Sequence, residues 1–131
     1  MTLSVLPLQI VRVLELEQAG ARRCFSAASG MWVENETLYV VADDELELGV
    51  FAWQSQQPGR TLSIIPGELP DDPARRKKLK PDFESLTGLP ACDRYPHGAL
   101  VAFGSGSTDQ RKRGMLWPFA APGQLAEAPQ L

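Results

Sequence analysis

The chain has 131 residues, which suits one ordinary domain and is short for two. Apolar residues make up 44% and charged residues 22%, so the chain can bury a core, and this excludes bulk disorder. A formal net charge of −3 excludes a general nucleic-acid coat protein, because such proteins are clearly basic. Eleven Pro and eleven Gly favour many short elements joined by turns.

Neither a membrane segment nor an export signal is expected. No apolar run approaches the roughly 20 residues that a spanning helix needs. The apolar N-terminus lacks a basic region before it and is interrupted by Pro7 and Arg12, so it does not resemble a signal peptide. Cys24 and Cys92 have no CxxC spacing, and we expect two buried or half-buried thiols in a reducing compartment. The sequence therefore predicts a cytoplasmic protein.

Short apolar runs separated by turn residues predict a meander of antiparallel strands. A tight polar turn at 34–36 joins two of these runs into a hairpin. The tail after Phe119 is expected to be a linker or a frayed terminus. The predicted strands are Ile10–Leu16, Ser26–Val33, Thr37–Ala42, Gly49–Trp53, Thr61–Ile65, Phe83–Leu89, Ala99–Gly104 and Gly114–Phe119.

One helix is predicted, between Asp72 and Lys80. Asp72 suits the N-cap, Pro73 suits the first helical position, and Pro81 ends the helix. The segment has almost no apolar face, so we expect a short exposed helix. Its basic run 75–80 either contacts phosphate or an acidic partner, or is a solvated surface that the flanking Asp residues compensate.

Residues 29–53 and 84–119 repeat one pattern. In both, a second strand ends in small or acidic residues and a third strand begins with Gly and carries aromatic side chains. The offset is 55 at the first strand and 61 at the second, because Ala91–His97 is an insertion. A repeat of this size is typical of a propeller blade, since no blade can bury both faces of its sheet alone. We expect Trp32, Trp53 and Trp117 between the blades.

The repeat predicts an all-β fold made of about two four-stranded antiparallel blades of a β-propeller. The first blade covers about 24–66 and the second about 82–119, with 120–131 as a tail. Together they form a single partial propeller domain over residues 1–131.

Five segments carry a family resemblance: Ser-Ala-Ala-Ser-Gly (26–30), Leu-Tyr-Val-Val-Ala-Asp-Asp (38–44), Lys-Pro-Asp-Phe-Glu-Ser-Leu-Thr (80–87), Gly-Ser-Gly-Ser-Thr (104–108) and Arg-Lys-Arg-Gly (111–114). They resemble the opening blades of bacterial six-bladed propellers, in an uncharacterised family related to the phytase-like and gluconolactonase-like propellers. Six blades of about 40–50 residues need about twice this chain. The expectation is therefore the N-terminal part of a larger protein, a truncated product, or a piece that closes a ring by oligomerising.

The resemblance implies a cation site on the inner strands. In calcium-dependent propellers similar to this one, carboxylates at the start of inner strands point into the central channel. Glu84 holds such a position, and Asp82, Asp43 and Asp44 are the nearest further candidates, because a divalent cation such as calcium prefers oxygen ligands. No DxDxDG spacing supports calcium directly. The alternative is a solvated turn at 43–45, with Glu84 paired to a nearby base.

The segment 104–113 resembles an anion-binding loop. Its glycines let backbone N–H groups approach an anion, its hydroxyls donate, and its guanidinium groups match a phosphate. The GK[ST] ending of a Walker motif is absent. The alternative is a flexible hairpin loop. The candidate side chains are Ser105, Ser107, Thr108, Arg111 and Arg113.

Three functions stay open at this point. By resemblance, the chain is a metal-assisted ester or phosphoester hydrolase, with Glu84 as a metal ligand and the loop 105–113 orienting an anionic group. Alternatively, it is a non-catalytic propeller that binds or scaffolds, or a fragment without independent activity. A Ser-His-Asp site is not expected, because no GxSxG elbow accompanies His97, the only histidine.

Two blades that do not close a propeller leave sheet faces and strand edges uncovered, and the expected partners follow from this. Exposed sheet faces and edges predict a homo-oligomer or association with the remainder of a propeller. A small anionic ligand fits the loop 105–113. Neither nucleic acid nor a membrane is expected as a partner.

Overall fold

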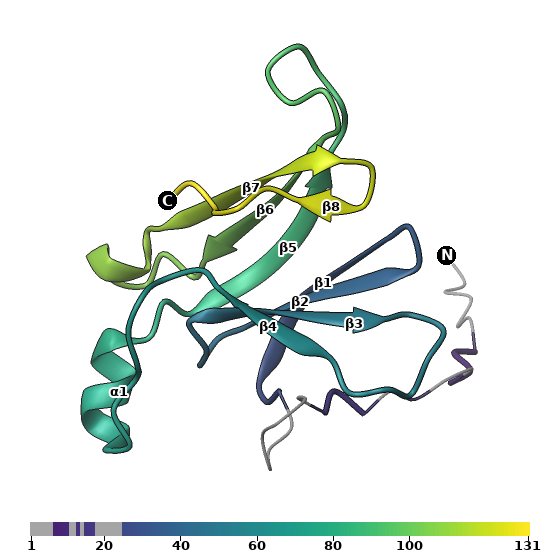
Figure 1. The fold of residues 1–131 in the computed structure, drawn as a ribbon. Coiled ribbons are helices and arrows are strands. Elements are labelled where there is room, and N and C mark those ends of the chain that lie inside the picture. Colours follow the sequence, from purple (N-terminus) through teal and green to yellow (C-terminus); the bar gives the residue numbers. More distant parts are fainter. Residues whose placement is uncertain (1–6, 11–12, 14, 18–24) are drawn as a thin grey trace, which may run out of the picture.

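The computed structural model describes residues 7–10, 13, 15–17 and 25–131, and it contains two four-stranded antiparallel sheets (Figure 1). Sheet one consists of β1 (Ala28–Glu34), β2 (Thr37–Ala42), β3 (Glu47–Ala52) and β4 (Arg60–Ser63). Sheet two consists of β5 (Phe83–Leu89), β6 (Ala99–Gly104), β7 (Gly114–Ala121) and β8 (Gln124–Leu125). Strands that follow one another in the chain are neighbours in each sheet, as in a propeller blade. The predicted all-β class is confirmed.

The same backbone irregularity opens each sheet. Ala27 precedes β1 with φ of 55°, and Asp82 precedes β5 with φ of 57°. Each strand then has a register shift within its first three residues. A positive φ is uncommon outside glycine, so its recurrence at the same place marks the two sheets as repeats of one unit.

The strand pairing fixes the offset between the repeats. Ala28 pairs with Ala42 in sheet one, and Phe83 pairs with Gly104 in sheet two. Position 28 therefore corresponds to 83, and position 42 corresponds to 104, 62 residues later. The expected second offset of 61 is wrong by one residue. The difference matters because a shift of one residue moves a side chain to the other face of a strand.

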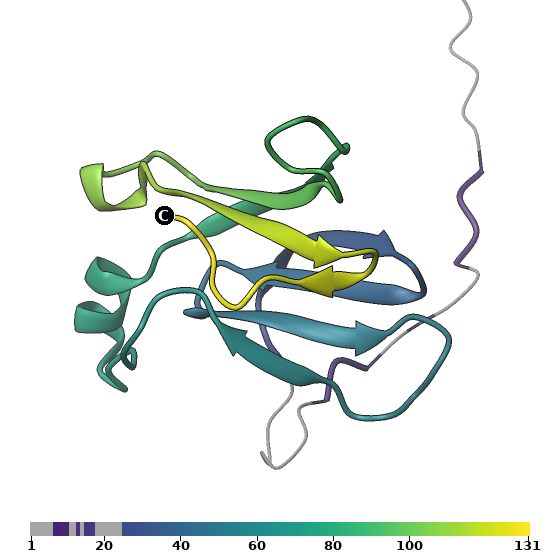
Figure 2. The ribbon, with the colours of Figure 1, turned by 45° about the horizontal axis from the view of Figure 1, so that its top comes forward.

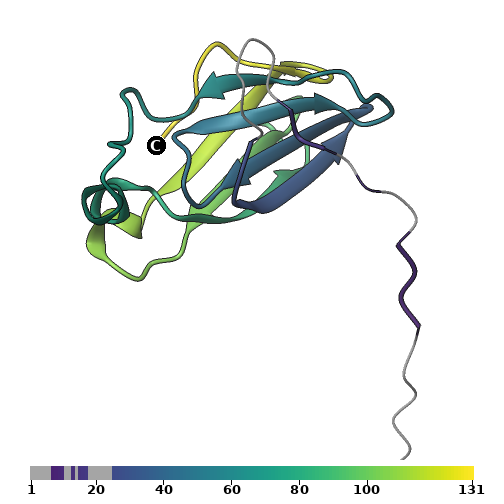
Figure 3. The same cartoon turned by 90° about the horizontal axis from the view of Figure 1, so that it is seen from below.

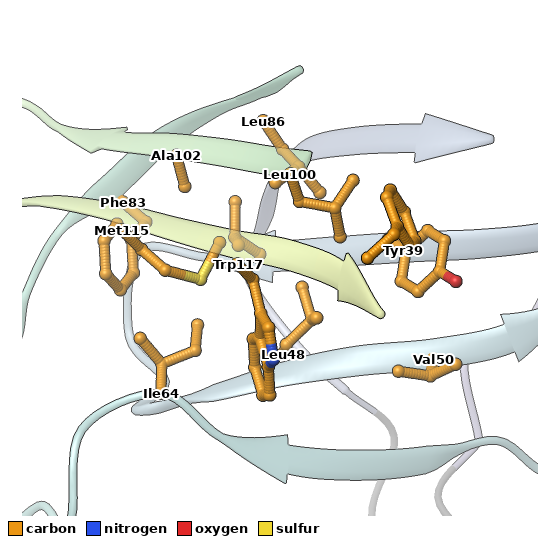
Figure 4. Close-up of a cluster of buried hydrophobic side chains, with 12 residues drawn as sticks. Tyr39, Leu48, Val50, Ile64, Phe83, Leu86, Leu100, Ala102, Met115 and Trp117 are labelled. Atoms are coloured by element: carbon orange, nitrogen blue, oxygen red, sulfur yellow. The ribbon is translucent and has the colours of Figure 1, made fainter. Parts of the chain in front are cut away.

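The two sheets pack face to face over one apolar core (Figures 2 and 4). The rings of Tyr39 and Phe119 meet edge to face across it, with centroids 5.9 Å apart. Sheet one contributes Tyr39, Val41, Leu48, Val50 and Ile64, and sheet two contributes Phe83, Leu86, Leu100, Ala102, Met115, Trp117 and Phe119.

Two of the three tryptophans lie where they were expected. Trp117 is buried between the sheets, and its indole N–H donates to the Ala126 carbonyl oxygen at 2.8 Å. Trp32 packs against the same core. The prediction is wrong for Trp53, which packs on the opposite face of sheet one. Trp53 follows Phe51 by two residues, and residues two apart in an extended chain share a face.

A second apolar cluster covers that opposite face of sheet one, which faces the viewer in Figure 3 with part of the N-terminal segment in front of it. The backbone N–H of Phe25 donates to the Leu16 carbonyl oxygen at 2.7 Å. Leu16 of the N-terminal segment therefore lies over this face. The cluster contains Phe25, Leu38, Val40, Ala42 and Phe51, with Leu16 and Trp53 packed against it.

The strand predicted at Ile10–Leu16 falls partly outside the described residues, which omit 11, 12 and 14. Its other residues are described, and none of them lies in a strand. Leu16, the last residue of this segment, accepts the hydrogen bond from the Phe25 N–H. The carbonyl oxygen of the next residue, Glu17, accepts from the backbone N–H of Gly59 at 2.8 Å. These bonds place residues 16 and 17 beside sheet one.

The C-terminal tail completes sheet two, so the expectation of a linker or frayed end is wrong. β8 pairs with β7, and Leu116 and Gln130 exchange two backbone hydrogen bonds of 2.8 and 2.7 Å. The residues that suggested a linker form the turn between the strands. Gly123 supplies the φ of 72° that this turn requires. Only the pairing with β7 identifies so short a strand.

The helix is confirmed as α1 (Pro73–Leu79). The Asp72 side chain accepts from the backbone N–H of Arg75 at 2.8 Å, and Pro81 follows the C-cap residue Lys80. None of its residues is buried. Among the described residues, no helix is long and apolar enough to cross a membrane.

The expected burial of Cys92 is wrong, because this thiol is exposed. The insertion at 91–97 forms a projecting loop, in which Cys92 and Tyr95 exchange two backbone hydrogen bonds of 3.0 Å. A closed turn of this kind carries its side chains away from either core. Cys24 lies outside the described residues.

Glycine allows the two inner strands, β1 and β5, to meet. A Cβ atom at Gly30 would lie 2.6 Å from the backbone nitrogen of Leu86 and 2.7 Å from the carbonyl carbon of Ser85. A Cβ atom at Gly88 would lie 2.4 Å from the indole ring of Trp32. Real Cβ atoms do not approach so closely, so either side chain would push the strands apart.

We expect Gly30→Ala to lower the free energy of unfolding by about 2 kcal/mol, since overpacking a core costs about 1–3 kcal/mol. Urea denaturation measures the change. Gly114→Ala is the matched control, because its nearest contact would be the exposed Phe103 ring at 3.3 Å, which can move aside. Equal stability of Gly30→Ala and the wild type would show that the strands separate without cost.

Candidate functional site

The candidate polar residues gather at one end of the two sheets. The β2–β3 loop carries Asp43 and Asp44, the β4–β5 connection carries α1 and Asp82, and the β6–β7 loop carries the segment 105–113. Figures 1 and 2 show α1 and the β6–β7 loop at the same end. They touch there, because the Arg111 guanidinium donates to a carbonyl oxygen of α1 at 2.7 Å.

Lys80 joins the two sheets electrostatically. Its Nζ lies 2.8 Å from Oδ2 of Asp43, which follows β2, and 3.0 Å from Oδ1 of Asp82, which precedes β5. The side chains of Lys80 and Asp82 are only 16% and 9% exposed. One ammonium group thus pairs with two carboxylates from different sheets, and water screens these contacts less than it screens a surface pair.

The β6–β7 loop binds the Asp82 carboxylate. Ser105 Oγ donates to Oδ2 of Asp82 at 2.6 Å, and the Arg111 guanidinium lies 3.1 Å from the same oxygen. Ser107 Oγ lies 2.9 Å from Ser105 Oγ and accepts from Arg111 at 3.0 Å. The loop therefore does surround an anion, as its composition suggests, and that anion is the protein's own carboxylate.

Thr108 and Arg113 take no part in this contact. Thr108 precedes the short 3-10 helix η1 (Asp109–Arg111) and makes no side-chain capping bond. Arg113 acts through its backbone, whose carbonyl oxygen accepts from the N–H of Gly104 at 2.9 Å, and its side chain is exposed. Both residues shape the loop through the main chain.

A second ion pair fixes α1 to sheet one. Arg76 Nε donates to Asp44 Oδ2 at 2.8 Å, and its Nη2 donates to the Asp44 carbonyl oxygen at 2.8 Å. Sequence reasoning placed Arg76 and Lys80 only within a basic helix surface. Their spacing of four was the available signal, because such residues lie on one side of a helix. We call the contacts among Asp43, Asp44, Arg76, Lys80, Asp82, Ser105, Ser107 and Arg111 the junction network.

The junction network keeps its charges at neutral pH. Burial raises the pKa of the Asp82 carboxyl, but the hydrogen bond from Ser105 and the charges of Lys80 and Arg111 outweigh it, so this pKa lies below its usual 3.8. Burial lowers the pKa of the Lys80 ammonium, but the hydrogen bonds and charges of Asp43 and Asp82 outweigh it, so this pKa lies above its usual 10.5.

The four carboxylates expected to hold a cation do not form one ligand set. Asp43 and Asp82 both bind Lys80, Asp44 binds a cation of α1, and Glu84 is exposed on β5. Within the part of the chain that the structure describes, no group of three or more His, Cys, Asp or Glu is arranged to hold a metal ion. Calcium takes six to eight oxygen ligands. These residues do not fit such a site.

Comparison with known proteins places the chain in a family. Residues 24–130 match the family of unknown function DUF6929. The chain belongs to DUF6929. No curated protein and no solved structure matches it. The matched region contains both sheets and the whole junction network, so the family pattern describes the paired sheets together.

In this DUF6929 chain, we expect Lys80→Met to lower the free energy of unfolding by about 2 kcal/mol, somewhat less than the roughly 3–5 kcal/mol of a fully buried pair. The cause is that Asp43 would then lose its ion-pair partner, and Asp82 beside it would keep only Arg111. Urea denaturation measures the loss. Lys112→Met is the matched control, because Lys112 pairs with Asp109 where the two side chains are 64% and 95% exposed. Equal effects of the two variants would contradict the conclusion that Lys80 stabilises the fold by pairing with carboxylates of both sheets.

The pKa shifts predict a plateau of stability. The pKa of Asp82 is lowered in the folded chain, so its contribution is complete above about pH 3.8 and is lost as the pH falls through the folded value. The pKa of Lys80 is raised, so its contribution is complete below about pH 10.5 and is lost as the pH rises through the folded value.

Thermal unfolding at neutral and at acid pH tests the acid limb of this plateau. Asp82→Asn should be less stable than the wild type at neutral pH, and it should lose less stability on acidification, because it has no carboxylate to protonate at this position. An equal acid-induced loss in both proteins would show that other carboxylates control the limb.

Proposed function

We propose that the chain is a non-catalytic binding module that takes an acidic partner on its basic surface. The basic surface is the set of exposed cationic side chains on α1 and on the end of the β6–β7 loop. It consists of Arg75, Lys77, Lys78, Lys112 and Arg113.

The observation that carries this proposal is that side-chain contacts hold α1 and the β6–β7 loop in place, while cationic side chains on α1 have no ion-pair partner among the described residues. Arg76 ties α1 to sheet one, and Arg111 ties the β6–β7 loop to the carbonyl oxygen of Lys77. Within the described residues, Arg75, Lys77 and Lys78 have no ion-pair partner. A surface that is already ordered loses less conformational entropy when it binds a partner.

The charge distribution supports the same function. The chain as a whole is acidic, with a formal net charge of −3, whereas cations gather on this surface. A local patch of one sign attracts a ligand of the other sign and increases its association rate. The attraction weakens with salt, because the charges are solvent-exposed.

Metal-assisted hydrolysis of an ester or phosphoester is the alternative function. It requires a cation held by carboxylates and a group that orients the anionic substrate. Asp43 and Asp82 bind Lys80, Asp44 binds Arg76, and Glu84 is exposed on β5. The loop side chains Ser105 and Arg111 bind Asp82. These internal contacts favour the binding function over the hydrolase.

Fluorescence anisotropy with a labelled poly-glutamate peptide tests the proposal. We expect binding at low salt that weakens at high salt, and Lys77→Gln/Lys78→Gln should weaken it by about fivefold, since each exposed ion pair contributes about 0.2–1 kcal/mol. The matched control is Arg60→Gln/Arg94→Gln, which removes the same charge at the start of β4 and in the loop 91–97. Absence of binding at low salt, or equal losses in both variants, would overturn the proposal.

A further inference from the structure

Two large apolar side chains are exposed on the outer faces of the sheets, at positions that are buried in the other repeat. Phe103 on β6 is 55% exposed, whereas its counterpart Val41, 62 residues earlier, is 0% exposed. Met31 on β1 is 66% exposed, whereas its counterpart Leu86, 55 residues later, is 7% exposed. Both counterparts lie in the core between the two sheets. The repeat therefore predicts that each exposed side chain also packs against another sheet face.

The correspondence extends to the whole faces. Leu38 lies on the outer face of sheet one, and its counterpart Leu100 lies in the core face of sheet two. Val101 lies on the outer side of β6, and its counterpart Tyr39 lies in the core face of sheet one. Each outer face therefore repeats the core face of the other sheet. Phe25 and Leu16 already cover part of the outer face of sheet one, and the part beside Met31, which corresponds to the core face around Leu86, stays open.

The outer face of sheet one has an open apolar hollow of about 430 Å³ beside Met31. Leu16 of the N-terminal segment forms one wall, and the rest of the hollow lies over β1 and β2. This is the side of β1 and β2 that corresponds to the face of β5 and β6 covered by sheet one. The lining residues are Leu16, Ala28, Ser29, Gly30, Met31, Leu38, Val40 and Trp53.

We propose that copies of this chain associate head to tail, with the outer face of sheet two in one copy packed on the outer face of sheet one in the next. Phe103 of the first copy enters the hollow beside Met31 of the second. The contact repeats the packing between the two sheets of one chain. Because the two surfaces differ, the association closes into a ring or extends into a chain of copies, and it does not form an isolated two-fold dimer.

This association is independent of the acidic partner proposed above. It uses the sheet faces, whereas the basic surface lies on α1 and the β6–β7 loop. Failure of either proposal therefore leaves the other intact, and the two are measured separately.

Light scattering after size-exclusion chromatography tests the association at micromolar to submillimolar concentration. We expect a wild-type mass of at least twice 14.4 kDa that rises with concentration. Phe103→Ser and Met31→Ser should each be monomeric alone, with unchanged far-UV circular dichroism. Leu79→Ser is the matched control, because this apolar side chain is 54% exposed on α1 and lies on neither face; it should assemble like the wild type.

A mixture of the two monomeric variants distinguishes the head-to-tail arrangement from a two-fold one. Phe103→Ser keeps an intact sheet-one face and Met31→Ser keeps an intact sheet-two face, so together they should form a pair of twice the chain mass that does not grow further. A monomeric wild type overturns the proposal. So do a mixture that stays monomeric and a Leu79→Ser control that loses assembly.

Discussion

The contact between the inner strands β1 and β5 sets the geometry on which the rest of the structure depends. Gly30 leaves its backbone beside that of Leu86, and Gly88 leaves room for the indole of Trp32. The sheets are therefore closest at their first strands. Larger side chains such as Trp117 fill the wider space between the third strands, so that one core joins the two sheets.

The junction network arises from the places where the two repeats differ. Ala27 and Asp82 occupy equivalent turns with positive φ, and in both turns the carbonyl oxygen accepts from the first residue after the second strand, Asp43 or Ser105. The two repeats therefore have the same backbone conformation at this turn. Only the second turn has a carboxylate, and only the first hairpin ends in one, and Lys80 between the sheets contacts both.

Local signals in the sequence were sufficient for β1 to β7 and for α1, because alternation and capping act over a few residues. They were insufficient for β8, whose two residues become a strand only beside β7. At the candidate site, the sequence predicted Asp82 as a cation ligand and Arg111 as an anion-binding residue, and the structure pairs these two side chains. That they bind each other across 29 positions depends on the fold, and no local pattern encodes it.

A site whose charges satisfy one another does not need a ligand, so the groups that remain unsatisfied indicate what the molecule contacts. In the described part of the chain, the solvent-exposed groups of this kind include cations on α1 and apolar side chains on the outer sheet faces. The hydrophobic effect is not directional, so an apolar contact between two surfaces depends on how well their shapes match. The repeat provides such a match, because each outer face corresponds to a core face. Exposed charge acts at longer range and depends on sign. Because the two kinds of group occupy different elements, the proposed stacking of copies through their sheet faces would leave the end that carries α1 open to the proposed acidic partner.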